Sequence, residues 1–277
     1  MLDVGQGDAI VVRTPRGHTI LIDSGGRLER GPGSDGRSPA ELVGERVVLA
    51  YLKREGIRDV DVLLNTHPHG DHVGGFPVVV RSLHVAEVVD SGQQYGGRAF
   101  QDGLHEAALR NVPVRPVRCG ARWSSDDGVT LSVLSPCGAL FADGKNDVNE
   151  NSVVTMLEFG GFRGLFTGDA GFEAEQRLVD SGIDLHADVL KVGHHGSAYS
   201  SSPEFLAEVK PRFALVSVGR HNLFGHPAPV TLAHLRTAGA GVYRTDRCGA
   251  ITLGVSGTPL VSTMIDCGPK PHEGFGR

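Results

Sequence analysis

The sequence lacks several features that would assign it to common protein classes. No run of about 18 apolar residues occurs among its 277 residues, so no membrane-spanning helix is expected. The amino end carries no basic and apolar signal sequence, because Met1 is followed at once by Asp3 and a glycine-rich turn. An excess of basic charge is also missing. The formal net charge of −5 counts against a nucleic-acid binder, although bound divalent cations would offset acidic ligands.

Cysteine is scarce, and its spacing excludes one common kind of metal site. The chain has four cysteines and no C-x-x-C pair, so a zinc knuckle is not expected. An even number permits disulfides in an oxidising compartment, whereas buried free thiols are the alternative, and the sequence leaves both open. The four residues are Cys119, Cys137, Cys248 and Cys267.

The composition that is present describes a folded chain. A hydrophobic content of 40% and 39 glycines are typical of a loop-rich α/β protein and not of a disordered one. The length is sufficient for one large domain with a full core. Because no linker-like run interrupts it, we predict a single domain over residues 1–277, with residues 268–277 forming a frayed tail.

A cluster of potential metal ligands follows residues 60–65, an apolar segment that predicts a buried strand. His67, His69, Asp71 and His72 fall within six positions. Imidazoles and a carboxylate suit zinc or a similar divalent ion. The first two histidines can share one ion while Asp71 and His72 serve a second, which indicates a two-metal hydrolase. The alternative is a histidine-rich surface turn or a pair of unrelated core histidines.

Further candidate ligands stand where other apolar segments end, as the metal loop does. Asp169 ends one predicted strand, and the pair His194 and His195 ends the next. One of these histidines should be a ligand, with a slight preference for His195, and the other would bind substrate or donate a proton. His226 is predicted to be the last ligand, because the proline that follows holds it extended.

The spacing His-x-His-x-Asp-His resembles the signature of the metallo-β-lactamase superfamily, which includes enzymes for many substrates. The resemblance implies an α/β fold, a four-layer αββα sandwich with mixed sheets. It implies that Asp23 orients the metal loop through hydrogen bonds without binding metal. It also implies that Asp169 bridges two ions and offsets their repulsion.

The combination of motifs is similar to the C-terminal domain of ComEC-type DNA-uptake channel proteins. The motifs lie at residues 3–9, 67–72, 167–169, 194–197 and 225–227, and the similarity runs over residues 2–253. It implies a nuclease that degrades the non-imported DNA strand during natural transformation, on the extracytoplasmic face of the cell membrane. DNA and the membrane channel portion of the parent protein would be its partners. Met1 would then not be the natural start, and the domain itself would be soluble without inserting into the membrane.

The sequence departs from the superfamily pattern in one loop. Many of these hydrolases have a histidine before the hairpin that holds the bridging aspartate, whereas residues 143–152 contain asparagines and a serine but no histidine. ComEC-like sequences share this substitution. Amide and oxygen ligands favour manganese over zinc.

Together these features predict a di-metal phosphodiesterase with two divalent metal ions, manganese or zinc. One ion is assigned to His67, His69 and His195, and the other to Asp71, His72 and His226, with Asp169 between them. The predicted catalytic residues are Asp71, Asp169 and His194. The predicted substrate contacts are Ser197, Asn149 and Ser152.

Three alternatives share part of this pattern. A phosphodiesterase of the same fold would act on another substrate, such as phosphocholine esters. A non-catalytic DNA-binding module would use its metal for stability, with closed coordination. A metallo-β-lactamase proper is disfavoured, because the polar, glycine-rich residues 24–39 lack the apolar hairpin expected to cover an antibiotic.

Overall fold

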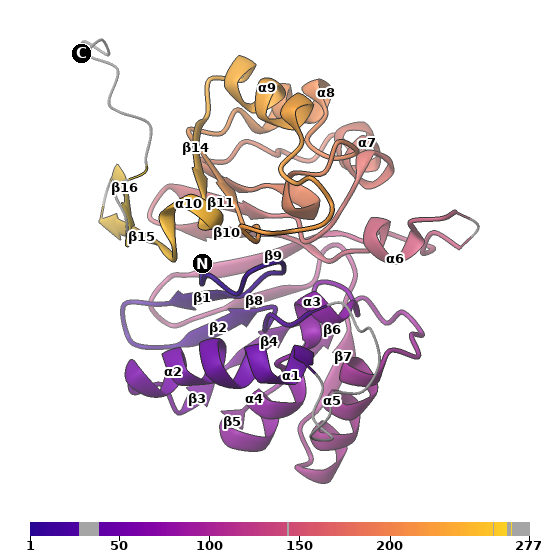
Figure 1. Cartoon of the computed structure of the whole chain (residues 1–277), viewed down its shortest axis with the longest axis vertical. Coiled ribbons are helices and arrows are strands. Elements are labelled where there is room, and N and C mark those ends of the chain that lie inside the picture. Colours follow the sequence, from indigo (N-terminus) through magenta and orange to yellow (C-terminus); the bar gives the residue numbers. More distant parts are fainter. Residues whose placement is uncertain (28–38, 143, 257, 265–266, 268–277) are drawn as a thin grey trace.

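The computed structural model describes residues 1–27, 39–142, 144–256, 258–264 and 267. Two sheets face each other, and helices cover the outer face of each (Figure 1). This arrangement confirms the predicted four-layer αββα fold. The expected tail at residues 268–277, and most of the loop at 24–39, lie outside the described residues. None of the helices in the described part of the chain is long and apolar enough to cross a membrane.

The first sheet is built from the amino-terminal half of the chain. Its five strands have the order β1-β2-β4-β6-β7, antiparallel only between β1 and β2. Its strands are β1 (Ile10–Arg13), β2 (Thr19–Ile22), β4 (Val62–Leu64), β6 (Val88–Asp90) and β7 (Val114–Pro116), with the small pair β3 (Asp59–Val60) and β5 (His84–Val85) nearby. Its helical segments are α1 (Pro39–Val43), the π-helical turn η1 (Gly44–Leu49), α2 (Ala50–Arg54), α3 (Gly70–Val73), α4 (Phe76–Ser82) and α5 (Arg98–Leu109).

The second sheet has seven strands in the order β14-β13-β12-β11-β10-β9-β8, parallel from β11 to β14. Its strands are β8 (Arg122–Ser124), β9 (Thr130–Ser135), β10 (Val154–Phe159), β11 (Phe162–Phe166), β12 (Val189–Lys191), β13 (Phe213–Val216) and β14 (Gly241–Arg244). Its helical segments are α6 (Asp147–Glu150), α7 (Phe172–Asp180), η2 (Gly193–Gly196), α8 (Pro203–Val209), α9 (Pro229–Thr237) and α10 (Thr245–Cys248). The hairpin of β15 (Ile251–Ser256) and β16 (Thr258–Thr263) follows.

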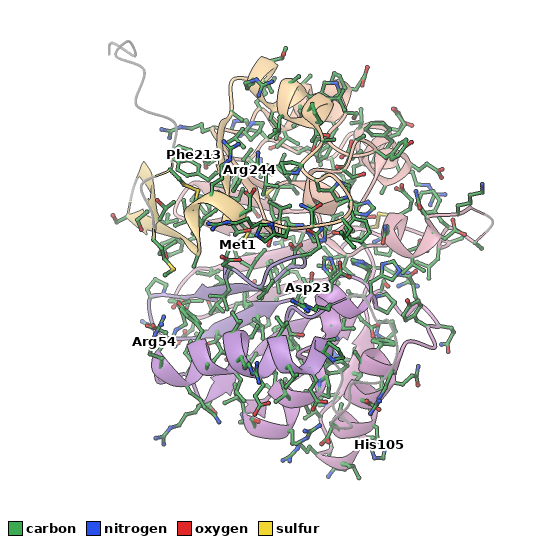
Figure 2. The ribbon with its side chains drawn as sticks, viewed as in Figure 1. Met1, Asp23, Arg54, His105, Phe213 and Arg244 are labelled. Carbon is green, nitrogen blue, oxygen red and sulfur yellow. A yellow bond between two sulfur atoms is a disulfide. The ribbon has the colours of Figure 1, made fainter. Side chains whose placement is uncertain are left out.

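Three apolar clusters hold the layers together. One lies between the first sheet and its helices, one between the second sheet and its helices, and one between the two sheets. The central cluster contains Ile20, Leu64, Leu131 and Phe166, so both sheets contribute apolar faces to it. Burial of two sheet faces against each other fixes how the strand ends of one sheet stand relative to those of the other. Arg54 and His105 lie on outer helices, whereas Asp23 is in the interior (Figure 2).

The structure differs from the predicted elements mainly at short segments. Residues 2–4, an apolar start followed by a glycine turn, form no regular strand and make isolated backbone bonds, such as the one from the amide of Leu2 to the carbonyl of Ala9 (2.9 Å). The loop at 143–152 contains the single helical turn α6, and the metal loop contains α3. Such turns are shorter than the periodic patterns from which helices can be predicted.

The cysteines, left open by the sequence, are all paired. Cys119 bonds Cys137, which ties the β7–β8 connection to the segment after β9. Cys248 bonds Cys267, which ties α10 to the residue that follows the last hairpin.

Candidate metal centre

The predicted ligands gather where strands of both sheets end. Asp23 follows β2, the histidine-rich loop follows β4, Asp169 follows β11, and His194 and His195 follow β12. In α/β proteins the carboxyl ends of parallel strands are the usual place for a site, because the loops there converge. The two sheets therefore supply one half of the centre each.

The amino-terminal turn holds the metal loop in place through the backbone. The amide of Asp8 donates to the carbonyl of Asp71 (3.3 Å), and the amide of Ser24 donates to the carbonyl of His72 (2.7 Å). Gly7 has a φ of +136°, and a Cβ there would lie 2.2 Å from the carbonyl oxygen of Asp71. Only glycine allows this approach, which explains the Gly-Asp pair at the start of the chain.

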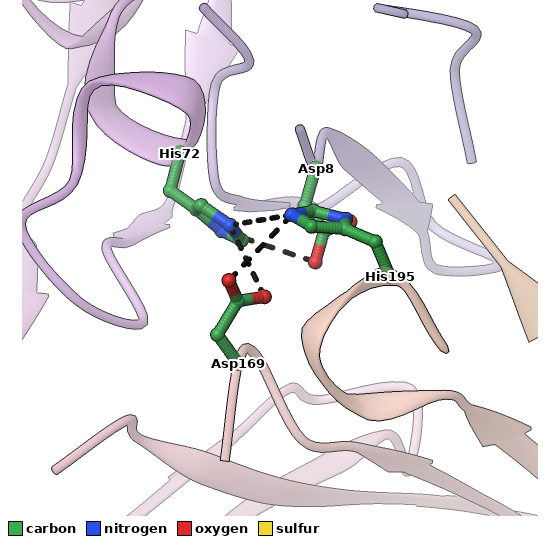
Figure 3. A group of neighbouring side chains, drawn as sticks. All are labelled: Asp8, His72, Asp169 and His195. Atoms are coloured by element: carbon green, nitrogen blue, oxygen red, sulfur yellow. Dashed lines mark hydrogen bonds and ion pairs between the residues drawn. The ribbon is translucent and has the colours of Figure 1, made fainter. Parts of the chain in front are cut away.

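Four buried side chains form what we term the inner group: Asp71, His72, Asp169 and His195. Nε2 of His72 lies 3.2 Å from Oδ1 of Asp169 and 3.3 Å from Nε2 of His195. Nε2 of His195 lies 3.5 Å from Oδ2 of Asp169 and 3.6 Å from Oδ2 of Asp71. Three of these residues and Asp8 have potential ligand atoms within 4.8 Å of one another (Figure 3).

Both histidines of the inner group are fixed by hydrogen bonds from their Nδ1 atoms. Nδ1 of His72 donates to Asp23 (2.7 Å), which also accepts the amide (2.8 Å) and hydroxyl (2.7 Å) of Thr66. Nδ1 of His195 donates to the carbonyl of Ser217 (2.9 Å). With their Nδ1 atoms engaged, both rings turn Nε2 toward Asp169. This is the contact that the proposed orienting role of Asp23 requires.

A second set of side chains, the outer group, comprises His67, His69, Asn149 and His194. Nε2 of His67 lies 3.1 Å from Nδ1 of His69 and 3.8 Å from Oδ2 of Asp169. Nε2 of His194 lies 3.8 Å from the same Asp169 oxygen and 3.4 Å from Nδ2 of Asn149. Asn149 therefore lies beside His194, in the loop that carries a histidine in many members of the superfamily.

The structure changes the predicted grouping of ligands. His195 lies with Asp71 and His72, whereas the sequence had grouped it with His67 and His69. His226, predicted to join Asp71 and His72, instead has its ring 5.7 Å from that of His194. Which ion each ligand would bind stays a prediction, because chain spacing does not determine which loops of the second sheet meet the first.

Two predicted substrate contacts are buried and already engaged. The hydroxyl of Ser152, which is fully buried, accepts the amide of Asp169 (3.1 Å). The hydroxyl of Ser197, also buried, accepts the amide of Tyr199 (3.3 Å). Both serines therefore help to position the loops that carry ligands, and their contact with substrate stays a prediction. Asn149 keeps a free carbonyl oxygen within the described part of the chain.

The sequence interpretation missed Asp8 and Lys191. Both side chains are buried and form an ion pair, and Nζ of Lys191 also donates to the carbonyl of Gly168 (3.0 Å). Oδ1 of Asp8 lies 3.5 Å from Nδ1 of His195. The available signal was a lysine within the otherwise apolar run at residues 189–192. A charge in such a strand requires a buried partner.

The inner and outer histidines differ in their preference for a proton. Burial opposes charge on His72 and His195, but nearby carboxylates, Asp169 above all, raise the pKa of both. Burial lowers the pKa of His67 and His194, and that of His226 to about 4. The inner carboxylates thus attract positive charge, a need that bound cations would meet while displacing protons from the histidines.

The residues present fit divalent ions. Several buried polar atoms have no hydrogen-bond partner among the described residues: Oδ1 of Asp8, Asp71, Asp169 and Asn149, and Nδ1 of His226. Buried polar atoms without a partner are rare and costly, so their concentration here indicates a site for a ligand. Imidazole nitrogens with carboxylate and amide oxygens are donors for zinc or manganese.

Comparison with known proteins agrees with this geometry. Residues 2–133 match the metallo-beta-lactamase superfamily. The chain is 34% identical over 255 residues to ComE operon protein 3 of Bacillus subtilis, covering 91% of the chain and 32% of that protein. It is 32% identical over 255 residues to competence protein ComA of Neisseria gonorrhoeae, covering 91% and 31%. The chain thus spans about a third of the length of these relatives.

Among solved structures, the metallo-beta-lactamase fold protein YhfI from Bacillus subtilis has a TM-score of 0.54 at 10% identity. The similarity covers 94% of the chain and 98% of that protein. At this identity it shows the fold alone.

Proposed function

Since this chain carries a metallo-β-lactamase domain homologous to those of ComEC-type competence proteins, we propose that it hydrolyses DNA phosphodiester bonds with the aid of two divalent ions. The DNA would be the strand that is not imported during natural transformation. The observation that carries the proposal is the position of Asp169. Its carboxylate lies within 4 Å of imidazoles from both the inner and the outer group, namely His67, His72, His194 and His195.

The chain's own side chains have separate tasks in such a reaction. When bound, the ions would polarise the phosphate and make a water molecule nucleophilic near neutral pH. Asp23 and the carbonyl of Ser217 keep the inner imidazoles turned toward Asp169. His194, whose side chain is 27% exposed, is the outer imidazole placed to contact a phosphate oxygen or to move a proton at the leaving oxygen.

An exposed apolar pair beside the centre supports a nucleic-acid substrate. The ring of Phe224 stacks on that of His226 at 5.7 Å, and Phe224 and Leu223 are 49% and 77% exposed. The loop is fixed by Asn222, whose side chain donates to the carbonyl of His226 (2.8 Å) and accepts its amide (3.0 Å). Nucleobases of a single strand stack on such rings without regard to sequence.

The proposed location follows from chemistry and from the relatives. Two disulfides suit an oxidising compartment, which supports the extracytoplasmic face of the membrane. Because the relatives are about three times longer than this chain, the membrane channel portion is proposed as a partner beside DNA.

The test is cleavage of linear single- and double-stranded DNA with manganese or zinc, with the metal content of the protein measured in parallel. We expect metal-dependent cleavage, with the single strand preferred. Turnover of phosphocholine esters but not of DNA would identify the other phosphodiesterase. DNA binding without turnover of either substrate would identify a non-catalytic module.

A further inference from the structure

We propose that Lys191 is a metal-selectivity residue, because its pairing with Asp8 withholds a carboxylate that would otherwise bind an ion in the inner group. The proposal concerns metal binding only. It therefore stands or falls separately from the proposed action on DNA.

Asp8 is near enough to the centre to be a ligand. Its carboxylate, His72, Asp169 and His195 offer ligand atoms within 4.8 Å of one another (Figure 3). The side chain is 1% exposed, and Oδ1 has no hydrogen-bond partner among the described residues. A buried carboxylate oxygen left free in this way is unusual, and next to a metal centre it amounts to an unused ligand.

Asp8 is not needed to orient the histidines of the inner group. The Nδ1 atom of His72 lies 3.8 Å from Asp8 but 2.7 Å from Asp23. The Nδ1 atom of His195 lies 3.5 Å from Asp8 but 2.9 Å from the carbonyl of Ser217. Each ring has a closer acceptor, so the task of fixing it is already carried out by another residue.

Lys191 is what engages Asp8 in the folded protein. Its side chain is 1% exposed, and its ammonium contacts Oδ2 of Asp8 and the carbonyl of Gly168, the residue before Asp169. A buried ammonium needs a carboxylate partner, and the short strand β12 fixes where that ammonium lies. The pair adds no net charge, so Asp71 and Asp169 remain the only carboxylates that the inner group presents among the described residues.

The number of carboxylates affects which ion is preferred. Two imidazoles and two carboxylates suit zinc, whereas a further carboxylate moves the set toward the oxygen-rich, higher coordination that manganese accepts. Lys191 would thus set the balance between the two metals by competing for one ligand. If Lys191 is removed, Oδ2 of Asp8 is released as well, and the carboxylate is free to turn toward the ions.

The experiment compares Lys191→Met, Asp8→Asn and the double variant, with Lys53→Met as a control for loss of an exposed lysine on α2. Affinities for Mn²⁺ and Zn²⁺ are measured by titration calorimetry, and bound metal by mass spectrometry. Visible absorption of the Co²⁺ form reports coordination number. In Lys191→Met we expect the ratio of Mn²⁺ to Zn²⁺ affinity to rise about tenfold or more, with weaker Co²⁺ absorption. The double variant and the control should bind as the wild type does.

The outcomes separate cleanly. An unchanged ratio of Mn²⁺ to Zn²⁺ affinity in Lys191→Met would overturn the proposal. Loss of an ion in both Asp8→Asn and the double variant would also overturn it, because Asp8 would then already be a ligand in the wild type. Lys191→Met leaves Asp8 buried and unpaired, so it is also melted with each metal. A larger melting-temperature gain from Mn²⁺ in Lys191→Met than in the double variant supports the proposal, and equal gains overturn it.

Discussion

The inner and outer groups of the candidate metal centre both contain histidines, but these histidines are supported differently. In the inner group, His72 and His195 each have a hydrogen-bond acceptor behind the ring, supplied by Asp23 and by the carbonyl of Ser217. In the outer group, only His67 has such a partner in the described part of the chain, the hydroxyl of Thr66 (3.2 Å from its Nδ1), while His67 contacts His69 and His194 contacts Asn149. Imidazoles with fixed tautomers and orientations bind metal with little reorganisation, so the inner group is preformed to a greater extent than the outer group.

This difference predicts that the two ions bind with different affinities. The inner group should take the first ion tightly, and the outer group should take the second ion weakly. Asp169 belongs to both, because one of its oxygens faces His72 and the other faces His67 and His194. A substitution in one group should therefore leave the metal affinity of the other group measurable. Asp169 is the exception, because it belongs to both.

Asp169→Ala should have the largest effect, because it removes the one carboxylate common to both groups. We expect loss of both ions and a decrease of roughly 10³-fold in the DNA cleavage rate. Calorimetry and the manganese-dependent assay measure the two effects. Asp180→Ala, on the exposed end of α7, is the control. Retention of one tightly bound ion in Asp169→Ala would show that the groups are independent and would contradict this account.

Asp23→Asn should weaken only the inner group. The amide cannot accept from His72 and both donors of Thr66 as the carboxylate does, so the ring loses its fixed orientation. We expect affinity for the first ion to fall by about 10- to 100-fold while the second site keeps its affinity. Titration of the two sites by calorimetry checks this. A uniform loss at both sites would mean that Asp23 supports the whole loop and not one histidine.

The contrast between the two groups also explains what could be predicted from the sequence. Local patterns identify four potential ligands within residues 67–72, and Asp169 and His195 at strand ends, and the structure brings these residues together. The arrangement of the two sheets followed from the same motifs through the family resemblance. These features depend on short stretches of chain.

The sequence could not show which loops meet. The position of His195 beside His72 follows from the packing of the second sheet on the first, and no spacing encodes that. The same packing buries Ser152 and brings Lys191 to Asp8 across 183 positions of the chain (191 − 8). Motifs thus identified the types of residue in the centre, and packing between layers determined their partners.

Asn149→His tests the outer group by strengthening it. Nδ2 of Asn149 lies 3.4 Å from Nε2 of His194, and its Oδ1 has no partner among the described residues, so an imidazole there would replace a weak amide ligand. We expect affinity for the second ion to rise about tenfold, with a shift toward zinc and little change at the first site. Competition between Zn²⁺ and Mn²⁺ at the weaker site is the measurement. Asn222→His is not a suitable control, because Asn222 fixes its own loop. Asn111→His, at an exposed position in the turn after α5, is used instead. No gain would show that Asn149 does not face an ion.

Substitution of Glu175 tests whether the inner group stays preformed as the pH changes. Of the substitutions considered, it should have the smallest effect on metal binding. It accepts the amides of Ser201 and Ser202 (2.8 Å for the latter), which fixes the segment after His195. Burial raises the pKa of Glu175 from 4.5 to about 7. The folded protein therefore holds a proton that the unfolded chain releases between pH 4.5 and 7. The free energy of unfolding should fall as the pH rises through this interval, by up to about 3 kcal/mol, and level off above it.

Glu175→Gln should remove that part of the pH dependence while affinity for the first ion changes little, because the neutral amide can still accept one of the two backbone donors. Urea unfolding of the metal-free wild type and variant from pH 5 to 8 gives the difference, with the exposed Glu173→Gln on the same helix as control. Parallel pH profiles for wild type and Glu175→Gln would contradict the raised pKa. A large loss of the first ion in Glu175→Gln would show that His195 depends on this distant anchor, and the inner group would then be no more rigid than the outer one.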